Sequence, residues 1–455
     1  MKHILLPLLA LSCLTLAADA QITPLPADRV AASMCLNVHN EFFPSNAATP
    51  VNFPYNYVTT YTNPTTGVVT TFNNQFFAVT LPAVKAAGIR CLRVGAAAPS
   101  GDGGTHPQEF FLRLNTENMD GFALDTVTPP TNIDSNFTSG GGWAQAEGAN
   151  EPDLSQPCST IIANQRVLYN TIKSDSNSQI AALPVLGPSL TTTYSPTWLK
   201  TCPTFAGIAD IGNWHPYNHA NNPEAAGWLY TYFASAQQLY PGVPIYATEY
   251  GLRTVQPGEV AKQNPVAGAP NNIITRYLPR VVLTMLNLAK DASGNHVGFA
   301  RTYWHQVADA VQSPTKVNAG YGVFFDKFGN PKPQGVAMGN MIHMFSDPSP
   351  VTPVPLSYAV KRVRGNAIIP RTMLFQRSDG RYMLPIWIGL PGWNGDTYTY
   401  ITVAPETVSV QLGTSVTSVT INTFNDDGTV SARTVTPVNG LFQMIATDHL
   451  QVLIF

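Results

Sequence analysis

The chain has 455 residues, of which 11% are charged, and its formal net charge is −2. This sparse and balanced charge argues against a nucleic acid or an anionic membrane as partner and favours a neutral one. The first twenty residues run from Lys2 through an apolar stretch to Ala18-Asp19-Ala20, the pattern of a cleaved signal peptide. No later stretch is apolar for long enough to cross a bilayer. We therefore expect a secreted or periplasmic protein.

About 435 residues remain after cleavage, a length that suits one large and one smaller domain. Four cysteines remain with them, namely Cys35, Cys91, Cys158 and Cys202. Their spacing matches no zinc motif, and an even count in an exported chain favours disulfides or buried thiols. Cys158 with Cys202 is the preferred bridge, because both lie in polar loops that contain proline.

From about residue 30 to 345, short β-rich runs alternate with amphipathic runs of helical period, as in parallel strands joined by crossover helices. The expected strands are 31–38, 89–95, 122–127, 145–149, 181–187, 207–214, 244–249 and 298–304. The expected helices are 107–119, 159–175, 223–240, 272–290 and 333–345. The pattern is weak between 99 and 145, so the third unit is expected to be short or irregular. Eight strands predict a (β/α)8 TIM barrel over residues 21–348.

After about residue 350 the pattern changes to short β-rich runs separated by turns such as Ser378-Asp379-Gly380 and Asp426-Asp427-Gly428. Closely spaced strands with glycine turns are typical of antiparallel sheets. We expect a small C-terminal antiparallel β-sandwich over residues 349–455, with a packing role rather than a sugar-binding one.

Barrel active sites collect at the carboxyl ends of the strands, so the polar residue after each apolar run is the one to inspect. On this reading only two carboxylates fall on strand ends, Glu151 after the fourth strand and Glu249 on the seventh. Glycosidases need such a pair, one protonated to release the leaving oxygen and one ionised to attack. A negative Glu249 nearby would keep Glu151 protonated. Asn150 beside Glu151 is suited to bind a sugar 2-hydroxyl.

The Asn150-Glu151-Pro152 motif, with Glu249 about one hundred residues later, resembles the clan A glycoside hydrolases, which include families 5, 30 and 39. The resemblance covers roughly residues 30–345. It implies a retaining mechanism with Glu249 as nucleophile and Glu151 as acid/base. The histidine that family 5 carries near its third strand is not found, so the chain resembles a divergent branch of the clan.

The same resemblance implies further substrate-site residues. Arg93 corresponds to an arginine beside the nucleophile, His215 and Tyr217 to a His-x-Tyr pair on the sixth strand, and Trp304 to the aromatic floor of the sugar site. His39, at the end of the first strand, is a candidate substrate contact by position alone. His305, Trp143, Trp214 and Tyr250 are weaker candidates by position, since such residues are as often core or satisfied hydrogen-bonders.

No cofactor and no catalytic metal are expected, because the histidines are scattered and the glycine run 140–142 lacks the features of a nucleotide loop. The predicted activity is hydrolysis of β-glycosidic bonds in a poly- or oligosaccharide by a monomer. Transglycosylation is a close variant. A catalytically inactive carbohydrate-binding or envelope protein on the same barrel is the alternative, although such a protein would need no paired acid and nucleophile.

Overall fold

The structure is a computed structural model that describes residues 21–38, 58–62, 69–73, 81–95, 120–124, 144–191, 201–217, 222–224, 228–254, 268–291, 294–309, 320–326, 330–363, 370–395 and 397–455. The predicted signal peptide, the predicted helix 107–119, His39 and Trp143 lie outside these residues. Among the described helices, none has both the length and the apolar character that a membrane crossing requires.

Eight parallel strands form one sheet, and each overlaps one of the eight predicted strands. They are β2 (Met34–Val38), β5 (Cys91–Gly95), β6 (Asp120–Leu124), β7 (Ala146–Glu147), β8 (Val185–Leu186), β9 (Gly212–Trp214), β10 (Ile245–Tyr250) and β13 (Arg301–His305). Their order is β8-β7-β6-β5-β2-β13-β10-β9, which follows the chain in cyclic order. Parallel bridges from Leu186 to Ile211 and from Leu190 to Trp214 join the two ends of this series.

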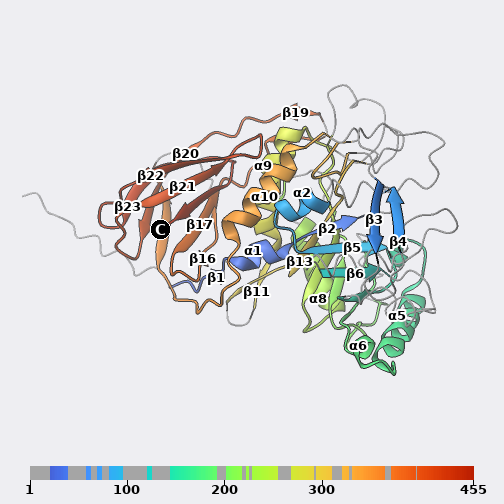
Figure 1. Cartoon of the computed structure of the whole chain (residues 1–455). Helices are drawn as coiled ribbons and strands as arrows, with labels where there is room; N and C mark the ends of the chain where they lie inside the picture. Colours follow the sequence, from blue (N-terminus) through green and yellow to red (C-terminus); the bar gives the residue numbers. More distant parts are fainter. Residues whose placement is uncertain are drawn as a thin grey trace, which may run out of the picture.

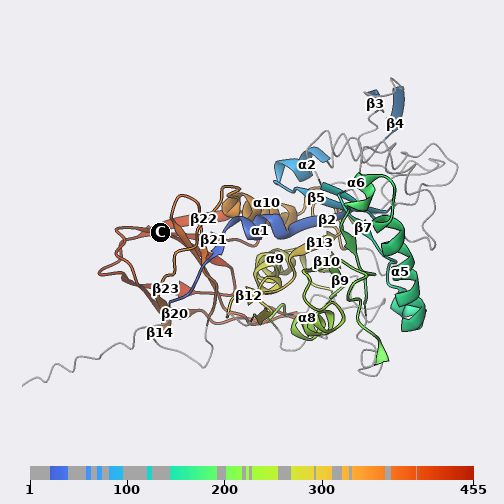
Figure 2. The same ribbon diagram turned by 90° about the horizontal axis from the view of Figure 1, so that it is seen from below.

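Helices connect the strands, so the α/β class predicted from the sequence is confirmed (Figure 1). They are α1 (Asp28–Ser33), α2 (Leu81–Ala86), the short 3-10 helix η3 (Pro152–Leu154), α5 (Cys158–Lys173), α6 (Ser178–Ala181), α8 (Trp228–Leu239), α9 (Asn271–Met285) and α10 (Pro333–Phe345). In α5 the predicted face of Ile161, Leu168 and Ile172 is buried. Helix α9 is buried from Ile273 to Met285 on almost every side, because it stands between the parallel sheet and the C-terminal sheets (Figures 1 and 2).

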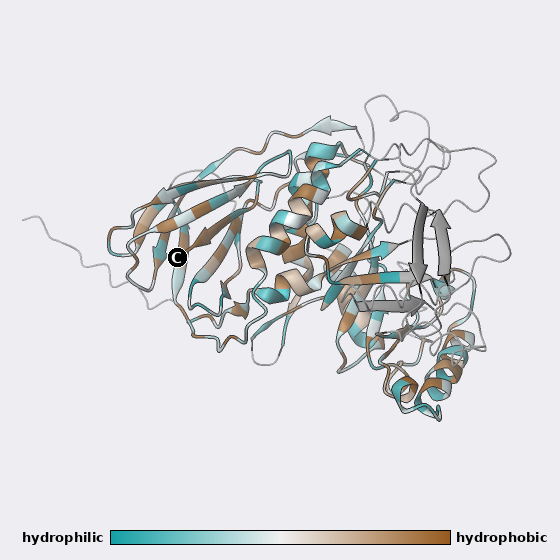
Figure 3. Cartoon of the chain, viewed as in Figure 1, coloured by the Kyte–Doolittle hydropathy of each residue, from teal (hydrophilic) through white to brown (hydrophobic). Residues whose placement is uncertain are grey.

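Two further sheets fill the C-terminal part of the chain. One contains β15 (Arg371–Thr372), β16 (Phe375–Gln376), β17 (Tyr382–Trp387), β21 (Val419–Phe424), β22 (Val430–Val435) and β24 (Gln451–Ile454). The other contains β14 (Tyr358–Arg362), β20 (Glu406–Leu412) and β23 (Leu441–Ala446). Buried and exposed residues alternate along β20 and β23, and Figure 3 shows apolar and polar residues alternating in the same region. The pairing of these strands is antiparallel, as expected.

The N-terminal segment adds a strand that the sequence did not predict. Strand β1 (Leu25–Pro26) pairs in parallel with β16 of the larger C-terminal sheet. A two-residue strand carries no detectable period, so only its tertiary partner reveals it. The division into 21–348 and 349–455 stays a prediction, but the N-terminal residues contribute to both parts.

Three short hairpins complete the described strands. They are β3 (Val58–Thr62) with β4 (Val69–Asn73), β11 (Ala289–Lys290) with β12 (His296–Val297), and β18 (Trp393–Asn394) with β19 (Thr399–Tyr400).

Two disulfides join cysteines in the part of the chain that the structure describes. Cys158 pairs with Cys202 as predicted, and Cys35 on β2 pairs with Cys91 on β5. The second pair is buried, and each of its cysteines lies two residues before a residue at the strand end, Asn37 or Arg93.

Candidate active site

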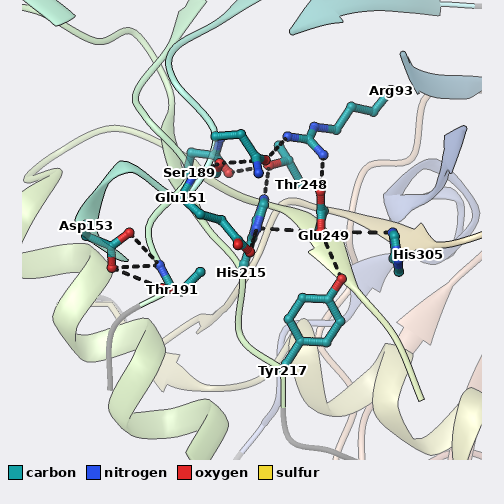
Figure 4. A network of polar contacts seen from close by, with 12 residues as sticks. Arg93, Glu151, Asp153, Ser189, Thr191, His215, Tyr217, Thr248, Glu249 and His305 are labelled. Atoms are coloured by element: carbon teal, nitrogen blue, oxygen red, sulfur yellow. Dashed lines mark hydrogen bonds and ion pairs between the residues drawn. The ribbon is translucent and has the colours of Figure 1, made fainter. Parts of the chain in front are cut away.

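The carboxyl ends of β5, β7, β9, β10 and β13 bring most of the predicted site residues together (Figure 4). Glu249 lies at their centre with a side chain only 9% exposed. One carboxylate oxygen, Oε1, accepts a hydrogen bond from Arg93 Nη1, and the other accepts from the Tyr217 hydroxyl at 2.9 Å. His305 Nδ1 lies 3.9 Å from the same Oε2. Two donors therefore fix the orientation of the Glu249 side chain.

Arg93 is the buried cation of the site, with a side chain 2% exposed. It donates from Nε and Nη2 to Glu147 at 2.7 and 3.1 Å, and from Nη2 to Asn150 Oδ1 at 2.8 Å. Burial alone would lower its pKa, but the charges of Glu147 and Glu249 outweigh burial and raise the pKa above the ordinary value. Arg93 thus stays charged and binds one carboxylate on each side.

Glu151 occupies a different environment from Glu249. Its side chain is 26% exposed, and its Oε1 lies 2.9 Å from His215 Nδ1. Its φ of +46° places it in the left-handed region, which is uncommon for a residue other than glycine and is found at functional sites. Its amide donates to the Ser189 carbonyl at 2.9 Å, and Pro152 begins η3 directly after it. The backbone therefore holds Glu151 at a fixed strand-to-helix corner.

The two predicted catalytic carboxylates lie close together. Glu151, His215 and Glu249 each place one oxygen or nitrogen atom within 4.8 Å of the others. Three such atoms could also bind a metal ion. However, both ring nitrogens of His215 already face hydrogen-bond partners, Glu151 and Thr248. The structure therefore places two carboxylates and the histidine that is hydrogen-bonded to one of them in a single cluster.

A third carboxylate was missed by the sequence reasoning, which found only two at the strand ends. Glu147 on β7 is completely buried and accepts hydrogen bonds from Arg93, from Asn213 Nδ2 at 2.6 Å and from Thr248 Oγ1 at 2.8 Å. The usable signal was an acidic residue inside the predicted strand 145–149, because a carboxylate that is buried in a sheet must find a partner. Asn213 and Thr248 were likewise not singled out.

Trp304 does not line the site. It is 1% exposed and packs edge-on against Tyr250, with ring centroids 5.2 Å apart. Neighbouring side chains on a strand point to opposite faces, and His305 faces Glu249 instead. Trp214 and Tyr250, considered as sugar platforms, are also fully buried in the core. The predicted aromatic floor is therefore not at Trp304 in this structure.

Tyr321 is a further aromatic residue beside the site. Its ring lies edge-on to Tyr217 at 5.9 Å and to His305 at 5.6 Å, and burial raises its pKa to about 12. Tyr321 thus packs beside two of the rings that surround Glu249.

No protein-family model matches the chain, and no curated protein matches it. Among solved structures it is similar to an endo-β-1,3-glucanase of family GH128 subgroup I from Amycolatopsis mediterranei in complex with laminaritriose. The identity is 15%, the TM-score is 0.38, and the match covers 68% of this chain and 99% of that one. It is also similar to a β-glucuronidase from Ruminococcus gnavus in complex with D-glucaro 1,5-lactone. There the identity is 12%, the TM-score is 0.43, and the match covers 71% and 52% of the two chains. Both neighbours are glycoside hydrolases, but at these scores the similarity by itself carries no argument about activity.

Proposed function

We propose that this protein is an exported retaining glycoside hydrolase that cleaves β-glycosidic bonds of a neutral poly- or oligosaccharide. The observation that carries the proposal is the contrast between two adjacent carboxylates. Glu249 is buried and fixed by two donors, whereas Glu151 is more exposed and faces a histidine. A double displacement needs one carboxylate that is held in place to attack and a second carboxyl group that can reach the leaving oxygen and water, and the two environments differ in this way.

The first step of this mechanism breaks the glycosidic bond. Glu151 gives its proton to the leaving oxygen while a Glu249 carboxylate oxygen attacks the anomeric carbon, forming a covalent glycosyl-enzyme. Arg93 and Tyr217 aim the attacking carboxylate, and the amide nitrogen of Asn150 is available to the sugar because its oxygen is taken by Arg93. In the second step Glu151 removes a proton from water, which displaces Glu249 with overall retention.

Two features support the fold and the substrate class in this proposal. The bridges from Leu186 to Ile211 and from Leu190 to Trp214 join the ends of the parallel series, as closure into a (β/α)8 barrel requires. Arg93 is committed to Glu147 and Glu249, which favours a neutral sugar over a uronic acid. We further propose a monomer with a secreted or periplasmic location.

The test compares wild type with Glu249→Ala and Glu151→Ala on aryl β-glycosides and on β-glucans, xylan, mannan and galactan. Asp379→Ala is the matched control, because Asp379 is an exposed carboxylate in the C-terminal part that pairs with Arg381. We expect Glu249→Ala to lower activity at least about 1000-fold. Azide should rescue Glu151→Ala on activated aryl glycosides and give a β-glycosyl azide.

Three outcomes would change the proposal. Activity unaffected by either glutamate substitution would remove these residues from the mechanism. Loss of wild-type activity in EDTA, with recovery on adding a divalent cation, would instead assign the Glu151, His215 and Glu249 group to a metal. Saccharide binding without turnover would favour the inactive binding protein.

A further inference from the structure

A chain of hydrogen bonds continues behind His215, on the side away from Glu151. Asn213 is completely buried, and its Nδ2 donates to Glu147 Oε1 at 2.6 Å and to the Gly187 carbonyl at 3.3 Å. The opposite amide orientation would put two acceptor oxygens 2.6 Å apart. Asn213 Oδ1 must therefore be the atom that faces Thr248 Oγ1 at 2.7 Å.

The Thr248 hydroxyl has three neighbours and only one hydrogen. Two of the neighbours are acceptor oxygens, Asn213 Oδ1 at 2.7 Å and Glu147 Oε1 at 2.8 Å. The third is His215 Nε2 at 3.0 Å. If Thr248 donated to His215, both oxygens would face a lone pair inside a fully buried site, which is costly. Thr248 therefore donates its hydrogen toward Asn213 Oδ1 and Glu147 Oε1. It follows that His215 Nε2 carries a hydrogen and donates it to Thr248 Oγ1.

This arrangement decides what the other ring nitrogen does. A neutral imidazole has one N–H, so if Nε2 carries it, Nδ1 is an acceptor. Nδ1 lies 2.9 Å from Glu151 Oε1, a contact that needs one proton between the two atoms. The proton is held either by Glu151 as a neutral acid or by the ring as an imidazolium ion. In both cases the Glu151–His215 pair holds one proton beyond the hydrogen on Nε2.

We propose that Thr248 and Asn213 are positioning residues that fix His215 as the Nε2–H tautomer and thereby keep Glu151 supplied with the proton it donates. The statement about catalysis rests on the proposed glycosidase function, whereas the tautomer itself does not. When the glycosidic bond breaks, the proton moves to the leaving oxygen and leaves a Glu151 carboxylate facing the Nδ1 lone pair. This unfavourable contact drives Glu151 to recover a proton from the attacking water.

The charges around the pair come from several elements. The nearest is Glu249, whose Oε2 lies 3.7 Å from His215 Nδ1. Arg93 on β5, Asp153 in η3, Tyr217 after β9 and His305 on β13 are further titratable or charged groups nearby (Figure 4). Glu147 on β7 lies behind them, hydrogen-bonded to Thr248. Arg93 is shared by Glu147 and Glu249 and so offsets part of their charge. A substitution at Thr248 that removes the hydroxyl takes one hydrogen bond from Glu147 but leaves the bonds of Glu147 to Arg93 and Asn213 in place.

The kinetic test uses Thr248→Val, which keeps the shape but removes the hydroxyl, and Thr248→Ser as the matched control. Without the Thr248 acceptor the ring can move its hydrogen to Nδ1 and donate to a Glu151 carboxylate. We expect the alkaline limb of kcat/KM to move down by about one pH unit in Thr248→Val. The value of kcat/KM for substrates with poor leaving groups should fall about tenfold, and it should fall much less for dinitrophenyl glycosides, whose first step needs no acid. Thr248→Ser keeps the hydroxyl, so its alkaline limb and its kcat/KM on both kinds of substrate should match wild type. An equal loss for both kinds of leaving group would overturn the proposed role in proton supply.

A second measurement does not depend on activity. Nitrogen NMR spectra of the whole chain with labelled histidine, with His215 assigned from its loss in His215→Asn, report which ring nitrogen carries hydrogen. We expect hydrogen on Nε2 in wild type and in Thr248→Ser, and a shift toward Nδ1–H in Thr248→Val. An Nδ1–H tautomer in wild type would overturn the proposal. An Nε2–H tautomer in a protein without glycosidase activity would support the tautomer assignment while refuting the proposed function.

Discussion

Two buried arginines invite comparison, because each is held by glutamate in a part of the molecule with a different task. Arg93 binds Glu147, Asn150 and Glu249 at the strand ends, where Glu151 and Asn150 are still accessible to a ligand. Arg280 of α9 binds Glu224 through two nitrogens and also donates to the Asp448 carbonyl at 3.2 Å.

The network around Arg280 is closed, whereas the one around Arg93 is open on one side. Trp387 Nε1 of the C-terminal sheet donates to Glu224 Oε1 at 2.7 Å, and the side chains of Arg280 and Glu224 are at most 1% exposed. This ion pair therefore joins α9, the segment after β9 and the C-terminal sheet. A buried arginine–glutamate pair thus stabilises the packing of two parts of the chain where all its groups are buried, as at Arg280. At Arg93 the same kind of pair forms part of a candidate site, because the neighbouring carboxylate of Glu151 is still exposed to solvent.

The largest expected effect is on stability at the closed network. Arg280→Met leaves Glu224 buried without its cation, which should lower the free energy of unfolding by about 3–5 kcal/mol. The specific activity of the folded fraction should stay at the wild-type level. Denaturant unfolding and activity after native purification measure the two quantities. Adding Glu224→Gln to Arg280→Met should recover part of the loss, and no recovery would mean that the lost packing of Arg280, not the charge, is responsible.

The next effect is on activity at the open network. Arg93→Lys keeps the charge, but one ammonium group cannot hold Glu147, Asn150 and Glu249 together. We expect kcat/KM to fall about 100-fold because Glu249 loses its alignment. The unfolding midpoint should fall less than in Arg280→Met. If Arg280→Met lost more activity than Arg93→Lys, and Arg93→Lys lost more stability, the proposed roles of the two arginines would be contradicted.

A smaller effect is expected at the hydroxyl donor to Glu249. Burial, and then the negative charge of Glu249, raise the pKa of Tyr217 well above 10, so the hydroxyl stays a neutral donor throughout the working range. Tyr217→Phe should lower kcat/KM about tenfold, the worth of one hydrogen bond to a carboxylate. The pH profile should keep its shape. Disappearance of the alkaline limb in this variant would instead identify Tyr217 as the titrating acid.

The smallest effect concerns pH and a second contact between α9 and the C-terminal part. His449 Nε2 lies 2.9 Å from Asp426, and Arg276 donates to Asp426 and Asp448. Burial lowers the pKa of His449, but its hydrogen bonds to the two aspartates raise it overall. Burial raises the pKa of Asp426 and Asp448, but their bonds to His449 and Arg276 lower it overall.

These directions define a pH window for the contact. The histidine contribution is complete below about pH 6.5 and disappears as pH rises through the raised pKa. The aspartate contributions are complete above about pH 4 and disappear as pH falls through the lowered pKa values. Thermal unfolding of His449→Asn against wild type should therefore differ most near pH 5, by about 1 kcal/mol or less since the groups are partly exposed, and hardly at pH 9. A difference that grows toward pH 9 would contradict the assigned charge states.

The sequence by itself predicted the parallel strands and the positions of Glu151 and Glu249 at the ends of two of them. A strand covered on both faces is a continuous apolar run, so its end can be located from local composition, and Glu151 and Glu249 follow from the ends. The Cys158–Cys202 bridge was also predicted, from the polar loops that carry it. These features depend on residues that are close together in the chain, so local composition is enough to predict them.

Tertiary structure alone decided which side of each strand faces the site. Trp304 and His305 are neighbours in sequence, yet only His305 approaches Glu249, because alternation fixes opposite faces without saying which one points inward. The role of Glu147 and the hydrogen on His215 depend in the same way on Asn213 and Thr248, which come from other strands. Which atom carries a hydrogen depends on all the acceptors around it. The sequence does not show which distant residues supply those acceptors.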